Sequence, residues 1–120
     1  MTRGRRPLIA LREAADIAAR RGKVLLMPAR RNAYFDLIIC TEQQTAFVRV
    51  KRIVTHYDDP QEIMQCCKRE ISPIRTVPVT GIVARELWLR SPRGVWQFFL
   101  IQPDTINGIL PDGSRMPGTD

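Results

Sequence analysis

The sequence predicts a single domain of the α/β or α+β class, in which a helix, three strands, a second helix and two further strands follow one another. Apolar residues recur at helical spacing in two segments and form short runs of strand length elsewhere. The 120 residues suit one domain, and they contain no internal repeat and no linker. Residues 1–110 should form this domain. Residues 111–120 should form a flexible tail, because their only large apolar side chain is Met116.

The first elements follow from short local signals. Pro7 suits the first turn of a helix, and the apolar residues after it recur at helical spacing as far as Ala18. Gly22 is placed to end this helix in a left-handed conformation. Residues 23–29 then predict a short buried strand, and the runs 34–40 and 45–54 predict a hairpin of two strands.

The second half of the chain begins with a helix-start signal. Asp59 can cap the helix, Pro60 takes its first position, and Glu62 completes a capping-box pattern. The helix should end at Ser72 and Pro73, because the residue before a proline avoids the helical conformation. Residues 84–101 predict two strands around an SPRG turn. Their large aromatic side chains should pack in the core: Trp88, Trp96, Phe98 and Phe99.

The composition favours a polyanionic partner. The formal net charge is +7, and the chain has sixteen arginines against three lysines. Since guanidinium groups bind phosphate in a bidentate way, we expect the partner to be nucleic acid, and DNA rather than RNA. No apolar run is long enough to cross a membrane, and Glu13 and Asp16 interrupt the basic and apolar start too early for a signal peptide. A cytoplasmic protein with reduced cysteines is therefore expected.

Charged residues lie inside the most hydrophobic segment, FDLIICTEQQTAFVRVKRI. Because side chains alternate along a strand, Arg49 and Lys51 share one face of the second strand. A loop closing symmetrically around residues 42 and 43 places Asp36 directly opposite Arg49. The hairpin should therefore carry a compact cluster of Asp36, Arg49 and Lys51. Such a cluster needs a reason, since unpaired buried charge is costly.

These residues resemble the core of the PD-(D/E)xK nucleases, in which a helix with an acid, a strand, a strand with Asp, a strand with acid-x-Lys, a helix and a strand follow one another. The spacing over residues 8–80 is most similar to the archaeal Holliday junction resolvase branch. Asp36 in FDLIIC resembles the metal-binding aspartate, although Phe35 replaces the commoner proline. Lys51 in FVRVKR resembles the catalytic lysine, and Glu13 the first-helix glutamate. The resemblance implies a restriction-endonuclease-like αβββαβ core with a mixed sheet, here followed by a C-terminal β-hairpin.

One position departs from the family pattern. Arg49 stands two residues before Lys51, where active members carry a second metal-binding acid. A guanidinium offers no oxygen ligand to Mg²⁺ and competes for Asp36 as an ion-pair partner. The resemblance therefore implies a degenerate metal site. If the chain is active, Mg²⁺ would be held by Asp36 and Glu13, with Lys51 assisting phosphodiester hydrolysis, and Glu62 is an alternative second acid.

Three functions stay open at this point. The favoured one is binding of the nucleic-acid phosphate backbone through Arg30, Arg31, Arg49 and Lys51. The second is an active Mg²⁺-dependent endonuclease or junction resolvase. The third is a non-enzymatic structural or protein-interaction module, in which an exposed aromatic residue would form a homodimer face.

Overall fold

The computed structural model describes residues 8–28 and 34–116, and it has the α/β architecture that the sequence predicts. In chain order the elements are α1 (Leu8–Ala19), β1 (Lys23–Leu26), β2 (Leu37–Cys40), β3 (Thr45–Arg52), α2 (Pro60–Cys66), α3 (Lys68–Ile74), β4 (Val83–Arg90), β5 (Trp96–Ile101) and β6 (Ile106–Ile109). The predicted order is confirmed, except that the second helix is split and a sixth strand follows.

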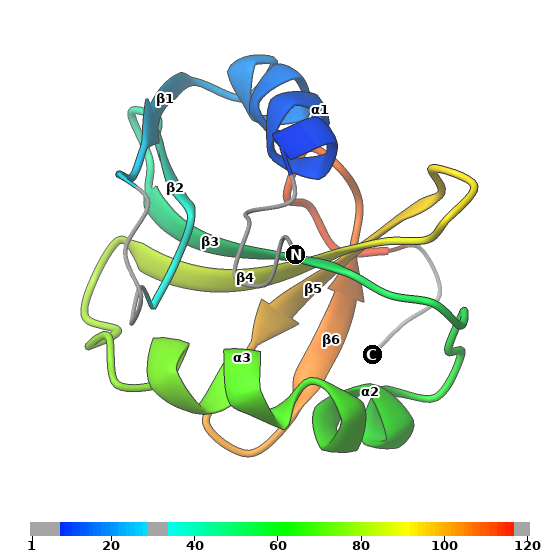
Figure 1. The fold of residues 1–120 in the computed structure, drawn as a ribbon. Coiled ribbons are helices and arrows are strands. Elements are labelled where there is room, and N and C mark those ends of the chain that lie inside the picture. The colour runs from blue at the N-terminus through cyan, green and yellow to red at the C-terminus, as the bar shows by residue number, and fades with distance from the viewer. Residues whose placement is uncertain (1–7, 29–33, 117–120) are drawn as a thin grey trace.

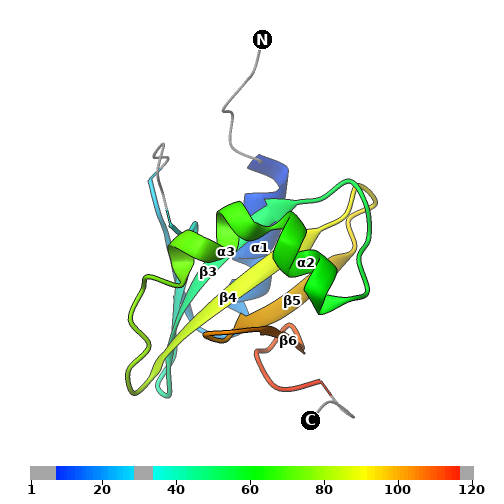
Figure 2. The same cartoon turned by 90° about the horizontal axis from the view of Figure 1, so that it is seen from below.

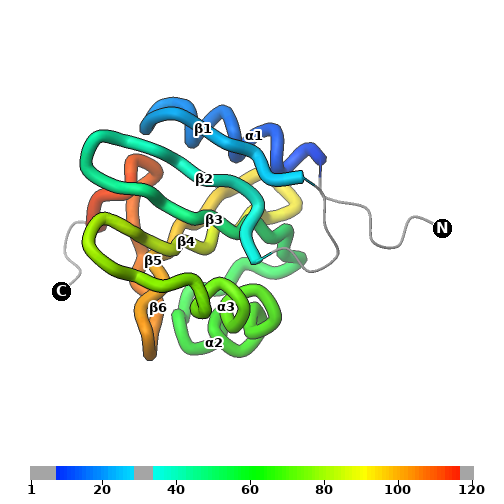
Figure 3. Tube along the Cα trace, turned by 90° about the vertical axis from the view of Figure 1, so that its left-hand side faces the viewer, coloured from blue at the N-terminus to red at the C-terminus, as the bar shows by residue number. Residues whose placement is uncertain are grey.

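The strands form one mixed sheet, and their order in space is their order along the chain. All neighbours pair antiparallel except β3 and β4, which run parallel. A parallel pair needs a crossover connection, and α2 and α3 supply it (Figure 1). The short turn between β2 and β3 is visible along the Cα trace (Figure 3).

Helices cover both faces of this sheet (Figures 1 and 2). On one face α1 packs through a row of alanines at helical spacing, Ala10, Ala14 and Ala18, whose small side chains let the helix approach closely. On the other face α2 and α3 bury Ile63, Ile71 and Ile74. Within the described part of the chain, no helix is long and apolar enough to cross a membrane.

Burial alternates along β3, so its two faces belong to two different cores. Ala46, Val48 and Val50 point to α1 and are buried. Phe47 and Ile53 point to α2 and α3. The residues between them on this second face are Arg49 and Lys51, as the alternation predicts.

The first strand differs from its prediction in length and burial. It spans four residues instead of 23–29, and as an edge strand it leaves Leu25 and Leu26 exposed. The helix before it ends at Ala19, and Gly22 is not left-handed. A glycine is required at position 22 for another reason, since a Cβ there would overlap the carbonyl oxygen of Cys40.

The second helix also differs from its prediction. Asp59 caps α2 by accepting a hydrogen bond from the Gln61 N–H at 3.0 Å, as expected. However, the helix breaks at Cys67, and Pro73 lies inside α3 instead of ending it. In so short a helix Pro73 removes a single backbone hydrogen bond near the end, which the packing of Ile71 and Ile74 outweighs.

The sequence gives little sign of β6, because Asn107 and Gly108 are poor strand formers. The predicted tail 111–120 lies within the described residues as far as Met116. Residues 111–114 form a turn in which the Leu110 N–H donates to the Ser114 carbonyl at 2.9 Å, and an isolated bridge joins Ile109 to Arg115.

Candidate nucleic-acid interface

The hairpin of β2 and β3 has the predicted register. Thr41 donates its backbone N–H to the Gln44 carbonyl at 2.9 Å, so the turn contains two central residues. Cys40 pairs with Thr45 and Leu37 with Val48. The paired register ends at Leu37, because the Asp36 N–H donates to the Val48 carbonyl at 2.8 Å, one residue short of Arg49.

The Asp36 carboxylate has two partners on β3. Its Oδ2 accepts the Val50 backbone N–H at 2.7 Å, and its Oδ1 lies 3.8 Å from Nη1 of Arg49. The predicted cross-strand ion pair is therefore confirmed. Asp36 is buried. Its carboxylate accepts the N–H of Val50, which lies two residues beyond Val48, the last residue of β3 that pairs with β2.

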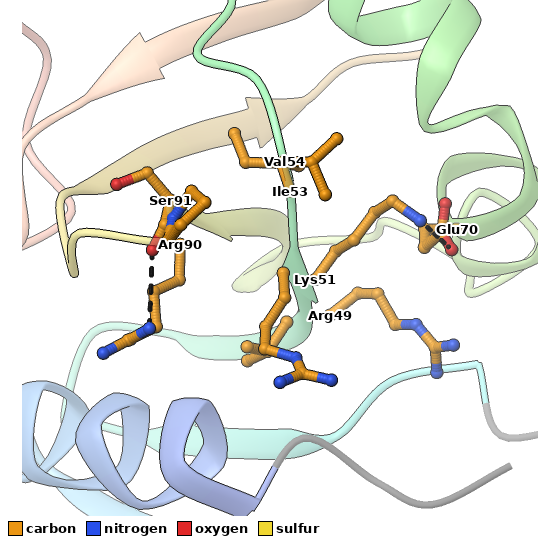
Figure 4. A pocket seen from close by; sticks show the side chains of 10 residues that line it. Arg49, Lys51, Ile53, Val54, Glu70, Arg90 and Ser91 are labelled. Carbon is orange, nitrogen blue, oxygen red and sulfur yellow. Dashed lines mark hydrogen bonds and ion pairs between the residues drawn. The ribbon is translucent and has the colours of Figure 1, made fainter. Parts of the chain in front are cut away.

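Lys51 points to the same face as Arg49 but reaches a different acid. Its Nζ lies 3.0 Å from Oε2 of Glu70 on α3, and Figure 4 shows the side chain extended toward that helix. The Lys51 side chain is 31% exposed and that of Glu70 13%. The other oxygen of Glu70 is buried and has no hydrogen-bond partner among the described residues.

The structure does not bring Glu13 to Asp36, and this corrects the predicted metal pair. Glu13 lies on α1, which covers the opposite face of the sheet from Arg49 and Lys51. Its carboxylate accepts hydrogen bonds from Arg90 Nε and Nη2 at 2.8 and 3.1 Å and from Trp96 Nε1 at 3.1 Å. These hydrogen bonds, with Arg90 first, hold the pKa of Glu13 below its ordinary value.

A cavity of about 600 Å³ opens where the parallel strands β3 and β4 end. It is lined by residues 49–54 of β3 and the segment after it, by Glu70, and by residues 90–92 (Figure 4). Because β2 starts at Leu37 opposite Val48, the end of β3 has β4 as its only strand neighbour within the described ranges. The cavity therefore wraps around a free strand edge and takes side chains from both faces of the sheet.

Four cationic side chains and one carboxylate line this cavity: Arg49, Lys51, Arg52, Arg90 and Glu70. Arg49, Lys51 and Arg90 each face a carboxylate, whereas Arg52 is exposed and has no side-chain hydrogen bond or ion pair with any described residue. Hydrogen bonds to Glu13 raise the pKa of Arg90 further. Ser91 is buried beside it and accepts the Val95 N–H at 3.0 Å.

Two of the predicted nucleic-acid contacts, Arg30 and Arg31, lie outside the described residues. Of the predicted site, Asp36, Arg49 and Lys51 come together on one hairpin. Glu62 is exposed in the first turn of α2 and does not line the cavity.

The residues present do not make a magnesium site of the predicted kind. Asp36 faces a guanidinium and a backbone N–H, while Glu13 lies across the sheet. No three His, Cys, Asp or Glu side chains gather as a metal-binding group in the part of the chain that is described.

Glu70, Arg52 and Arg90 are site residues that the sequence did not single out for this role. Alternation along β3 places Arg52 on the face opposite Lys51, but the open end of the sheet lets both faces meet in one cavity. Glu70 is placed by the crossover, because a helix that joins two parallel strands packs over them. The sequence offers one indication of this role, namely that Glu70 is an acid in the helical segment that follows the Lys51 strand.

The single histidine and the three cysteines lie outside this site. His56 lies 3.1 Å from Asp58 in an exposed segment. The three cysteines are free, as expected, and burial raises the pKa of Cys67 to about 12, which suits a structural thiol.

Comparisons with protein-family models, with curated proteins and with solved structures find no match to this chain.

Proposed function

We propose that the chain binds the phosphate backbone of nucleic acid, DNA first, through the cavity at the ends of β3 and β4. The observation that carries this proposal is the lining of that cavity, in which four cationic side chains stand against one carboxylate. In open α/β sheets, ligands bind outside the carboxyl ends of parallel strands, and this cavity lies at such a place. The net charge of +7 supports the same class of partner.

Arg52 is the first phosphate contact in this proposal. It is exposed at the end of β3 and meets no carboxylate in the described ranges, so its guanidinium is available for bidentate binding. Hydrogen-bonding directions alternate along a strand, so the backbone N–H of Arg52 points to the same side as that of Val50. Asp36 occupies the Val50 N–H, which leaves the Arg52 N–H as the next donor on this edge.

Arg90 and Lys51 supply further positive charge. Lys51 is paired with Glu70, and Arg90 is paired with Glu13. Neither ion pair uses all the N–H donors of the cation, and the further contact of Arg90 with the Ser91 carbonyl is long, at 3.4 Å. Partly exposed ion pairs are worth about 0.2–1 kcal/mol, so a phosphate that contributes its own charge can share or replace such a partner.

The order of the elements supports a restriction-endonuclease-like core. From α1 to β4 the chain follows the order that the resemblance implies, with a mixed sheet and helices on both faces. In this interpretation Arg49 replaces the second metal-binding acid. Cationic side chains would then contact the phosphate directly, in place of a metal ion. The protein would thus keep the nucleic-acid surface and lack cleavage.

The experiment is a binding assay on labelled DNA across a salt series. Wild-type protein should bind duplex, branched and single-stranded DNA with an affinity that falls between about 50 and 200 mM salt. Arg52→Ala should lower the affinity several-fold and reduce the salt slope by about 1. Arg69→Ala is the matched control, because Arg69 is an exposed arginine on the outer side of α3 and lines a different cavity.

Two results would overturn the proposal. One is a wild-type protein without salt-dependent binding to any of these nucleic acids, which would favour the interaction module. The other is an equal loss of affinity in Arg52→Ala and Arg69→Ala, since that would mean that net charge alone acts and that the cavity is not the site.

A further inference from the structure

A second cavity, of about 410 Å³, lies between α1, β5 and the turn that follows β6. Its walls are apolar and largely aromatic: Ile17 from α1, Trp96 and Phe98 from β5, and Pro111 from the turn. Arg20 and Asp112 stand at its polar side. Preformed apolar cavities of roughly 300–1,000 Å³ with a few polar groups are the usual sites of small, flat ligands.

The aromatic wall is fixed by its own packing. Trp96 and Phe98 are nearly parallel, with centroids 6.1 Å apart and an interplanar angle of 14°. Trp88, which is fully buried, meets both of them edge-on, at 6.3 Å and 4.9 Å. The two rings therefore present a surface that does not need to form when a ligand arrives.

The opposite wall is fixed by a buried ion pair. Arg21 donates two hydrogen bonds to Glu86, at 2.8 and 2.9 Å, and its guanidinium lies so close to Gly113 that a Cβ there would overlap it. Gly113 has a φ of 90°, which only glycine adopts without strain. Asp112 accepts hydrogen bonds from the Ser114 N–H and hydroxyl and closes this turn.

Arg20 gives the cavity its chemical preference. Its side chain is exposed and has neither a hydrogen bond nor an ion pair within residues 8–28 and 34–116. Asp112 already accepts two hydrogen bonds, which hold its pKa below its ordinary value. A planar ring against the aromatic wall, with an anionic group against Arg20, satisfies both features of this cavity.

One carboxylate accepts hydrogen bonds from residues that line both cavities. Glu13 accepts hydrogen bonds from Arg90, which lines the basic cavity, and from Trp96, which lines the aromatic one. We propose that the aromatic cavity receives one unpaired base of the nucleic acid whose phosphates lie in the basic cavity, with Arg20 against the phosphate of that nucleotide. This inference rests on the proposed function and makes it more specific, since it requires single-stranded or branched substrate. Base stacking on aromatic side chains should raise affinity for such substrates roughly tenfold over duplex.

The test uses adenosine monophosphate, adenosine and inorganic phosphate as separate probes of the full chain. The readout is the indole N–H resonance of Trp96, assigned with Trp96→Phe, and the buried Trp88 serves as the internal reference. Adenosine monophosphate and adenosine should shift the Trp96 signal, and inorganic phosphate should not. Arg20→Gln should weaken binding of the monophosphate but not of adenosine. Arg12→Gln, which changes an exposed arginine on α1, should change neither.

A second variant tests the polymer. Ile17→Phe adds bulk to the cavity wall and should remove the preference for single-stranded over duplex DNA while duplex binding stays within twofold. If millimolar adenosine monophosphate leaves Trp96 unmoved, or moves Trp88 alone, the base cavity is refuted, and salt-dependent duplex binding would still uphold the proposed function. If adenosine monophosphate binds but no polymer does, the proposed function fails and so does the placement of a strand across both cavities.

Discussion

Glu70→Gln should make the protein bind nucleic acid more tightly. In the wild type the Lys51 ammonium lies 3.0 Å from the Glu70 carboxylate. Under the proposed function, this carboxylate would compete with phosphate for Lys51. The amide keeps the shape of the side chain and removes its charge. The Glu70 side chain is only 13% exposed, so little else on the surface changes.

The expected gain follows from counterion release. One further cation on a duplex phosphate steepens the dependence of log K on log salt by about 0.9. At 0.1 M salt this corresponds to an affinity about eightfold higher, or about 1.2 kcal/mol. For a single strand the slope should change by about 0.7.

Fluorescence anisotropy across a salt series measures both quantities at once. Glu62→Gln is the matched control, because Glu62 is an exposed carboxylate in the crossover helices that does not line the cavity. It makes the same change in net charge. The reasoning is refuted if Glu70→Gln leaves affinity and slope unchanged, or if the two variants tighten binding equally. Thermal unfolding of both variants checks that the fold is retained.

Two other predictions concern the sheet. Glu86→Gln should lower the free energy of unfolding by about 3–5 kcal/mol, because it leaves the Arg21 guanidinium without a charged partner, and both side chains are less than 7% exposed. Urea unfolding measures this free energy, and a loss below about 1 kcal/mol would contradict the prediction. Arg49→Glu places a second carboxylate opposite Asp36, so Mn²⁺ or Mg²⁺ should raise the melting temperature of this variant and not that of the wild type. Metal-dependent cleavage of branched DNA by Arg49→Glu would further show a competent scaffold, whereas equal metal responses of the two proteins would count against the placement of Arg49.

The hairpin could be predicted from sequence because its determinants are local. Alternation fixes which side chains share a face, and a two-residue turn fixes which residues lie opposite one another. Asp36 and Arg49 form the expected ion pair, although the paired register ends at Leu37. The element order was accessible for the same reason, since helix caps and apolar runs act within a few residues.

The surroundings of the hairpin could not be predicted in this way. The resemblance places Glu13 at the Asp36 site, but which face of the sheet α1 covers depends on packing between distant segments. The partners of Glu86 and Lys51 lie 65 and 19 residues away along the chain. Such pairs follow from the three-dimensional arrangement of α1 and of the crossover helices, and no local pattern encodes them.

The position of Asp36 explains why the basic cavity exists where it does. At the start of β2 its carboxylate takes the place of a further strand residue, because it accepts the Val50 N–H that a longer β2 would pair. It also orders Arg49 at the rim, with 3.8 Å between the charged atoms. With Asp36 in this structural role, the end of β3 stays open beside the carboxyl end of β4. The same residue that suggests catalysis in the sequence thus shapes, in the folded chain, the edge at which Arg52 and its neighbours line the basic cavity.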